Sequence, residues 1–178
     1  SRDNYFLVNN NIKLKGGYIP DSDTDSTNDI QDYTNPTILS GDIGDNDTID
    51  MTTGNIIDNT ENIFQVLITT NLDSNAHIDG IQIIGGNAEA IGNFTQRNID
   101  GQEIYTDFGG GMYNHSNSSP MITNSTFSKN EGNYGGGMYN NSRANPTIIN
   151  CIFNKNKSNN GGGIYNNFFA TPTITNSI

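Results

Sequence analysis

The chain has 178 residues, contains no Trp and is only 32% hydrophobic, which argues against a large compact core. Its 19 acidic and 8 basic residues give a formal charge of −11; this charge repels nucleic-acid phosphates and anionic lipid, so neither is an expected partner. The 20 Gly and 31 Asn favour short strands joined by tight turns over long helices.

Residues 1–89 are expected to form irregular strands separated by two acidic loops. Short apolar runs predict strands at 5–8, 12–14, 37–39 and 64–68. No apolar run approaches the roughly 18 residues of a membrane span, so we expect no membrane-spanning segment.

The first acidic loop has the spacing of a calcium-binding loop. In a twelve-residue segment, side-chain oxygens occupy positions 1, 3, 5, 9 and 12, and position 7 can offer its backbone carbonyl. These residues are Asp21, Asp23, Asp25, Thr27, Asp29 and Asp32. Ser26 stands where glycine is expected, and Asp32 where a longer Glu is expected. The segment predicts a calcium site, with a solvated acidic loop as the alternative.

The second acidic loop is another candidate for calcium, with looser spacing. Its carboxylates are Asp42, Asp45, Asp47 and Asp50. Carboxylate oxygens are the ligands that calcium prefers, so the same two readings apply to this loop.

A 26-residue repeat governs the C-terminal part. The block Gly-Gly-Gly-Met-Tyr-Asn begins at Gly109 and Gly135, and returns with Ile for Met at Gly161. A second block, led by Pro, keeps the same step from residues 120, 146 and 172. Each such unit must stack on its neighbours to bury an apolar face. The expected fold is therefore all-β, a parallel β-helix (solenoid) with about 26 residues per coil.

The repeat extends upstream in degenerate form. Residues 78–86 match the Pro-led block, with Ile78 in the place of Ile122. These two residues are 44 positions apart, 18 more than one repeat, and we place the excess in the polar stretch 90–107. The chain is thus one β-helical domain, 1–178, with degenerate coils at 1–89, a protruding loop insertion at 90–107 and regular coils at 108–178.

Equivalent side chains are expected to form columns through the stack, because strand side chains alternate between the two faces. The inward columns are Ile122, Ile148 and Ile174; Phe127 and Phe153; and Ser125, Cys151 and Ser177. The only cysteine is therefore read as an interior packing residue. Asn124, Asn150 and Asn176 mark a bend where amide side chains of neighbouring coils are expected to bond.

A tyrosine column lies next to an aliphatic one. Tyr113, Tyr139 and Tyr165 follow Met112, Met138 and Ile164, and alternation allows only one of the two sets to face inward. We assign the aliphatic set to the core, so the tyrosines predict an outward aromatic ladder suited to sugar rings or a protein partner. The alternative is that the rings merely cover the sheet or are partly interior.

The Gly-Gly-Gly-Met-Tyr-Asn blocks and the Pro-Thr-Ile-Ile-Asn-Cys-Ile-Phe block at 146–153 resemble repeats of bacterial right-handed parallel β-helix surface proteins. These include chlamydial polymorphic outer-membrane proteins and related adhesins. Residues 16–18 and 36–43 resemble the leading coils of large secreted proteins of Bacteroidota. The resemblance implies a right-handed β-helix that is extracellular or at the bacterial cell surface, and it leaves the activity open.

Two functions follow as hypotheses. The first is a non-enzymatic, adhesin-like binding domain or structural stalk that meets a glycan or a protein. The second is a fragment of a calcium-dependent polysaccharide lyase or hydrolase, which would need a basic residue beside the calcium-binding carboxylates. None of Arg97, Arg143, Lys129, Lys155 and Lys157 adjoins an acidic loop in sequence, which favours the first. Because residues 176–178 stop midway through a block, we expect further coils beyond both ends.

Overall fold

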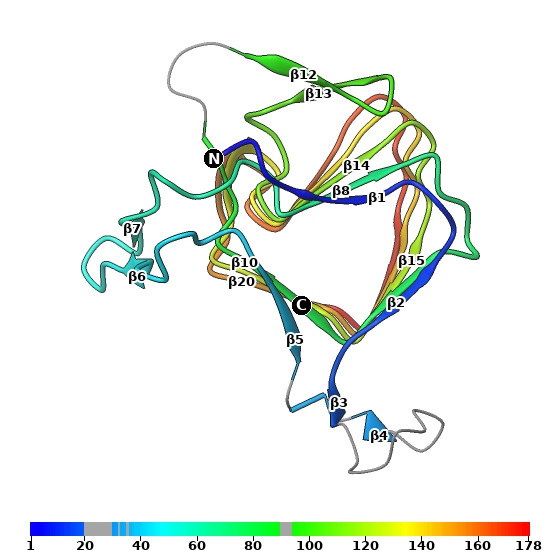
Figure 1. The fold of residues 1–178 in the computed structure, drawn as a ribbon, viewed down its shortest axis with the longest axis horizontal. Coiled ribbons are helices and arrows are strands. Elements are labelled where there is room, and N and C mark those ends of the chain that lie inside the picture. Colours follow the sequence, from blue (N-terminus) through cyan, green and yellow to red (C-terminus); the bar gives the residue numbers. More distant parts are fainter. Residues whose placement is uncertain (20–29, 32, 35, 90–93) are drawn as a thin grey trace.

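The computed structural model describes residues 1–19, 30–31, 33–34, 36–89 and 94–178. Within these ranges every regular element is a β-strand, and no helix is present. Four sheets are parallel, and three two-stranded sheets are antiparallel. Figure 1 shows the parallel sheets surrounding a common interior, with the antiparallel pairs outside them.

Two parallel sheets have five strands each. The tyrosine sheet contains, in spatial order, β1 (Phe6–Val8), β8 (Leu67–Thr70), β14 (Met112–His115), β18 (Met138–Asn140) and β22 (Ile164–Asn166). The isoleucine sheet contains β2 (Lys13–Lys15), β9 (His77–Asp79), β15 (Met121–Thr123), β19 (Thr147–Ile149) and β23 (Thr173–Thr175).

The remaining sheets are smaller. The phenylalanine sheet contains β5 (Thr37–Ser40), β10 (Ile81–Ile84), β16 (Thr126–Ser128) and β20 (Ile152–Asn154). The fourth parallel sheet contains β11 (Asn87–Ala88), β17 (Glu131–Tyr134) and β21 (Lys157–Asn160). The antiparallel pairs are β3 (Tyr18–Ile19) with β4 (Ile30–Gln31), β6 (Thr48–Ile49) with β7 (Ile56–Ile57), and β12 (Gln96–Ile99) with β13 (Gln102–Tyr105).

The strand register follows the sequence repeat. Met112 pairs with Met138, and Met138 pairs with Ile164, so each step along the tyrosine sheet advances the chain by one 26-residue unit. In the isoleucine sheet Ile122 pairs with Ile78, which confirms the alignment of the degenerate upstream block. The extra residues between these two strands include β12 and β13, which form a hairpin within the predicted insertion at 90–107.

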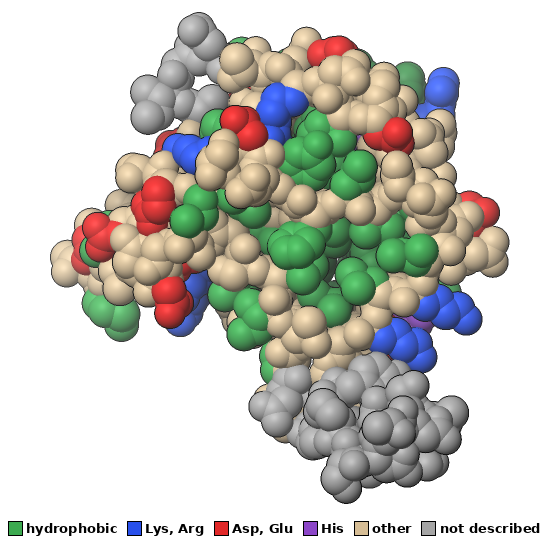
Figure 2. All heavy atoms as spheres, in the orientation of Figure 1, with side chains coloured by type: hydrophobic (Ala, Val, Ile, Leu, Met, Phe, Trp, Pro, Cys, Tyr) green, Lys and Arg blue, Asp and Glu red, His purple; other side chains and the backbone are tan. Residues whose placement is uncertain are grey.

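The interior contains the predicted columns. Ile122 and Ile148 are fully buried, the rings of Phe127 and Phe153 stack with centroids 4.7 Å apart, and Cys151 is buried as a free thiol. Ile174 is 48% exposed because β23 is the edge strand of its sheet. Figure 2 shows hydrophobic side chains at the centre of the face that carries β1, β2 and β5.

The glycine triplets have two distinct roles. The first glycine of each triplet has a positive φ, 66° at Gly109, 65° at Gly135 and 68° at Gly161, which glycine adopts without steric cost. The second packs against the neighbouring repeat, since a Cβ atom on Gly136 would collide with the carbonyl oxygen of Lys157. The triplet therefore turns the chain and lets adjacent repeats approach closely.

Asparagine side chains connect the repeats at two levels. The predicted external ladder is present: Asn150 Nδ2 donates to Asn124 Oδ1 at 3.3 Å, and both residues have positive φ. A second ladder lies within the tyrosine sheet, where Asn114 and Asn140 are fully buried. Asn114 Nδ2 donates to Asn140 Oδ1 at 2.7 Å, and Asn140 Nδ2 donates to Asn166 Oδ1 at 2.8 Å. This ladder is not among the features predicted from the sequence, although these residues end each glycine-led block.

Replacing Asn140 by Ala should destabilise the protein. The change leaves the Nδ2 group of the fully buried Asn114 without its acceptor, which costs about 1–3 kcal/mol of unfolding free energy. Urea unfolding measures this loss. The control is Asn159→Ala, which removes an exposed amide bond to Asn133 and should change stability by less than about 0.5 kcal/mol. Equal losses in the two variants would contradict a special role for the buried ladder.

Candidate functional site

Most of the first predicted calcium loop lies outside the residues that the structure describes. Its six candidate ligands, Asp21, Asp23, Asp25, Thr27, Asp29 and Asp32, all lie outside the described residues. Calcium binding by this loop therefore stays a prediction.

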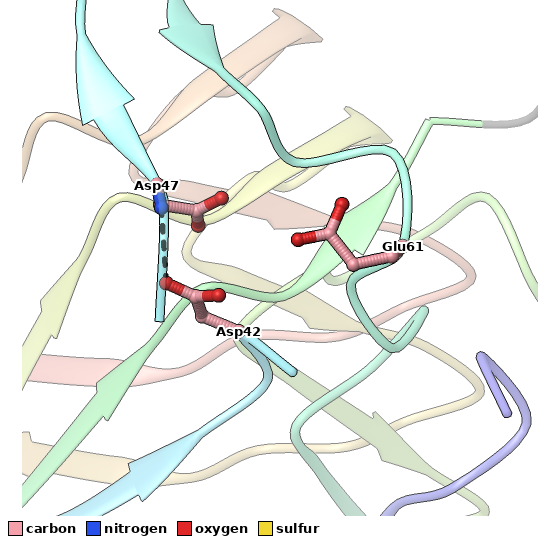
Figure 3. A group of neighbouring side chains, drawn as sticks. All are labelled: Asp42, Asp47 and Glu61. Atoms are coloured by element: carbon pink, nitrogen blue, oxygen red, sulfur yellow. Dashed lines mark hydrogen bonds between the residues drawn. The ribbon is translucent and has the colours of Figure 1, made fainter. Parts of the chain in front are cut away.

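Two carboxylates of the second acidic loop form a cluster with a third carboxylate that lies outside the loop. Asp42 and Asp47 meet Glu61, which lies between β7 and β8, and one carboxylate oxygen of each residue lies within 4.8 Å of the other two. Figure 3 shows the three side chains converging. Asp45 is not in this triad, and Asp50 instead accepts hydrogen bonds from Thr52 N and Thr53 Oγ1 in the turn after β6.

The loop is folded around Asp42. Its Oδ1 accepts the backbone N–H groups of Gly44 and Asn46 at 3.1 and 3.3 Å, and its Oδ2 accepts that of Asp47 at 3.1 Å. The Asn46 amide nitrogen can also reach Glu61 Oε1, at 2.6 Å. These bonds fix the orientation of Asp42 toward the other two carboxylates.

The pKa of Asp47 is perturbed by its surroundings. Burial, followed by repulsion from Asp42 and Glu61, raises its pKa to about 6, although a hydrogen bond from Asn62 and the positive charge of Lys129 oppose the shift. The bond from Asn62 Nδ2 reaches Oδ2 at 2.7 Å, while the buried Oδ1 accepts no hydrogen bond within the described part of the chain. Three clustered carboxylates of this kind can hold a hard cation such as calcium.

The tyrosine column does not form the exposed ladder that the sequence predicts. Met112 and Met138 belong to the interior core, as predicted, and the tyrosines point to the other side of the sheet. Tyr113 is fully buried there and Tyr139 is only 2% exposed. They pack in a second cluster with Ile99 and Ile104 because the hairpin β12–β13 lies over them. Only Tyr165, at the far edge, remains partly exposed.

An aromatic cavity adjoins the partly exposed end of this column. It has a volume of about 380 Å³ and is lined by seven aromatic residues and two asparagines. Phe94, Tyr105 and Phe108 come from the hairpin and its flanks, whereas Tyr139 and Tyr165 come from the tyrosine sheet. The tyrosines are among the candidate residues predicted from the sequence, but the contribution of the inserted hairpin to the cavity is not.

Several other ionisable residues are engaged in structural contacts. Arg97 forms an ion pair with Asp3 at 3.5 Å, and Lys157 pairs with Glu131. His77 Nε2 bonds to Thr123 Oγ1 at 2.8 Å, and Thr123 Oγ1 donates to Asp79. Burial raises the pKa of the Cys151 thiol, which disfavours a reactive thiolate.

Comparison of the chain with protein-family models, with curated proteins and with solved structures finds no match. The part of the chain that the structure describes has no helix with the length and apolar character needed to cross a membrane.

Asp107, beside the cavity-lining Phe108, is an isolated buried carboxylate. It is fully buried, and neither of its carboxylate oxygens accepts a hydrogen bond of normal geometry from the residues that the structure describes. Burial raises its pKa despite a favourable contribution from nearby Asn133. A raised pKa in the folded state means that the folded protein binds the proton more tightly, so stability is lost as pH rises through that pKa.

Replacing Asp107 by Asn should therefore stabilise the protein at pH 7, by about 1–3 kcal/mol. The gain should disappear below the ordinary carboxyl pKa of 3.8, where Asp107 is neutral in both states. Urea unfolding at several pH values measures this dependence. Asp58→Asn removes the same charge at an exposed position and serves as control. A gain independent of pH would show that ionisation of Asp107 is not the cause.

Proposed function

We propose that this chain is a right-handed parallel β-helix that acts outside the cell or at the bacterial cell surface, as an adhesin-like binding domain or structural stalk. The observation that carries the binding role is the aromatic cavity of about 380 Å³ beside the tyrosine sheet. Stacked repeats supply a rigid sheet, and an inserted hairpin adds a concave wall to it. Binding residues commonly lie on loops that a rigid scaffold positions.

The parallel pairing of successive repeats and the resemblance of the glycine-led blocks to surface-protein repeats support the architectural part of this proposal. The partner is a glycan or a protein, since the charge of −11 opposes nucleic acid. The first test is retention of the purified protein on immobilised extracellular glycans and proteins. We expect reversible retention with no chemical change in the ligand.

A calcium-dependent polysaccharide lyase or hydrolase is the second candidate, favoured by one observation. Lys129 lies close enough to Asp47 to lower its pKa, so a basic residue does stand near the acidic triad despite its distance in sequence. A calcium ion held by the triad could bind a uronate carboxylate, and Lys129 could remove the proton from the carbon next to that carboxylate. Incubation with uronate polymers tests this directly, because formation of unsaturated product would overturn the non-enzymatic proposal.

Calcium, if bound by the triad, should stabilise the protein. A ligand that binds only the folded state adds about 1.4 kcal/mol at ten times its Kd, which corresponds to a rise in Tm of roughly 2–4 °C per kcal/mol for a chain of this size. We expect this rise in millimolar calcium chloride, its reversal by chelator, and its loss in Glu61→Gln.

Asp45→Asn is the matched control for that experiment, because Asp45 carries the same charge in the same loop but lies outside the triad. If the calcium-dependent rise in Tm persists in Glu61→Gln, the ion binds at another site. The paired change Asp23→Asn and Asp25→Asn would then test the first loop. No rise in the unmodified protein would contradict calcium binding at either place.

A further inference from the structure

The aromatic cavity beside the tyrosine sheet has the geometry of a stacking site. The rings of Tyr139 and Tyr165 are parallel within 2°, with centroids 5.8 Å apart. Tyr134 meets Tyr165 edge-on at 5.1 Å, and Phe108 contacts Tyr139 at 4.9 Å. These contacts hold flat aromatic faces in fixed orientations. Such a face can pack against the C–H face of a pyranose ring while the ring hydroxyls remain free for hydrogen bonds.

Polar groups stand among these rings. Asn141 Nδ2 donates to Tyr113 Oη at 3.2 Å, and Asn167 Nδ2 donates to Tyr139 Oη at 2.9 Å. Asn141 is only 5% exposed, and its Oδ1 accepts no hydrogen bond from the described residues. The Tyr165 hydroxyl belongs to a residue of the same lining. The cavity lining therefore offers a ligand the Tyr165 hydroxyl, which can both donate and accept, while the acceptor of Asn141 lies buried in the wall. A hydroxyl of this kind suits a ligand rich in hydroxyl groups.

One turn of the repeat departs from its pattern at the rim of the cavity. The turn after β22 places Phe168 and Phe169 at φ of 44° and 64°. The same two left-handed positions hold Ser116 and Asn117 in the first regular repeat, and Ser and Arg in the second. A bulky side chain is strained in this conformation.

Strain and exposure at this turn coincide with the cavity. Phe168 is 63% exposed and Phe169 is 81% exposed, and only Phe168 lines the cavity. Phe168 thus places an aromatic ring at the rim of the cavity, although its backbone strain lowers the stability of the protein. Strain and exposure of this kind are expected of a residue that binds a ligand.

The charges in and around the cavity favour an uncharged ligand. Among the residues that the structure describes, the lining contains no charged side chain. The carboxylate of Asp107 is close enough to Tyr139 to contribute to the raised pKa of that phenol, which burial mainly causes. The chain as a whole carries a charge of −11. An anionic sugar would find no cation to pair with in this cavity and would be repelled by the surrounding field.

We propose that this cavity binds one neutral pyranose ring of an extracellular glycan, stacked on the aromatic wall formed by Tyr165 and Phe168. This assignment rests on the proposed binding function and gives it a ligand class and a place. The strained turn supplies one side of the site, and the inserted hairpin supplies the opposite side.

The test titrates the full chain with neutral hexose oligosaccharides of several linkages and with oligogalacturonate, using calorimetry and the tyrosine fluorescence of this tryptophan-free protein. Phe168→Ser restores the residue that both earlier regular repeats have at this position, so the variant should fold at least as stably as the unmodified chain. We expect it to weaken binding of the neutral oligosaccharide by about tenfold. Phe169→Asn removes the neighbouring ring outside the cavity and should leave the affinity unchanged.

The possible outcomes separate this inference from the proposed function. Equal affinity in the unmodified chain and in Phe168→Ser overturns the cavity assignment but leaves a glycan-binding role intact, because the sugar then binds elsewhere. The cavity assignment is also overturned if oligogalacturonate binds more tightly than the neutral sugar. The same holds if a phenylalanine-containing peptide of higher affinity displaces the sugar. If no neutral oligosaccharide binds, the cavity assignment fails. If the protein is also not retained on any immobilised glycan or protein, the proposed function fails as well.

Discussion

In-register pairing between successive 26-residue units is the constraint on which the other features depend. Backbone hydrogen bonds continue through the glycine turns as well as the strands: Gly111 N donates to Gly136 O at 3.0 Å, and Gly137 N donates to Gly162 O at 3.0 Å. This pairing places identical side chains one above another. It explains how a chain that is only 32% hydrophobic retains a continuous interior, since each apolar side chain is buried by its counterparts in neighbouring repeats.

Stacking also determines how asparagine is used. An amide has both a donor and an acceptor, so a column of identical amides can satisfy itself from one repeat to the next. The buried column through Asn114 and Asn140 is joined by Thr69, whose hydroxyl donates to Asn114 Oδ1. A polar residue thus continues the ladder into the degenerate part of the chain. Hydrogen bonding and apolar packing therefore follow the same period.

The insertions give individual repeats distinct surfaces. The hairpin β12–β13 covers Tyr113 and Tyr139 and helps to enclose the aromatic cavity. The loop around β6 and β7 brings Asp42 and Asp47 to Glu61. In both cases the regular stack supplies a rigid base, and a segment that breaks the repeat supplies the chemistry. This division is common where loops carry function on a repetitive scaffold.

The sequence by itself determined the all-β class, the 26-residue period, the equivalence of Ile78 with Ile122, and the inward columns of Ile, Met and Phe. These features follow from local alternation and repetition, which are visible in a linear pattern. Only the tertiary structure decided what covers the tyrosines, because the outward face of a strand does not specify what packs on it. It also decided that Glu61 joins Asp42 and Asp47 while Asp45 and Asp50 do not, because the meeting of carboxylates depends on how two irregular segments fold across one another.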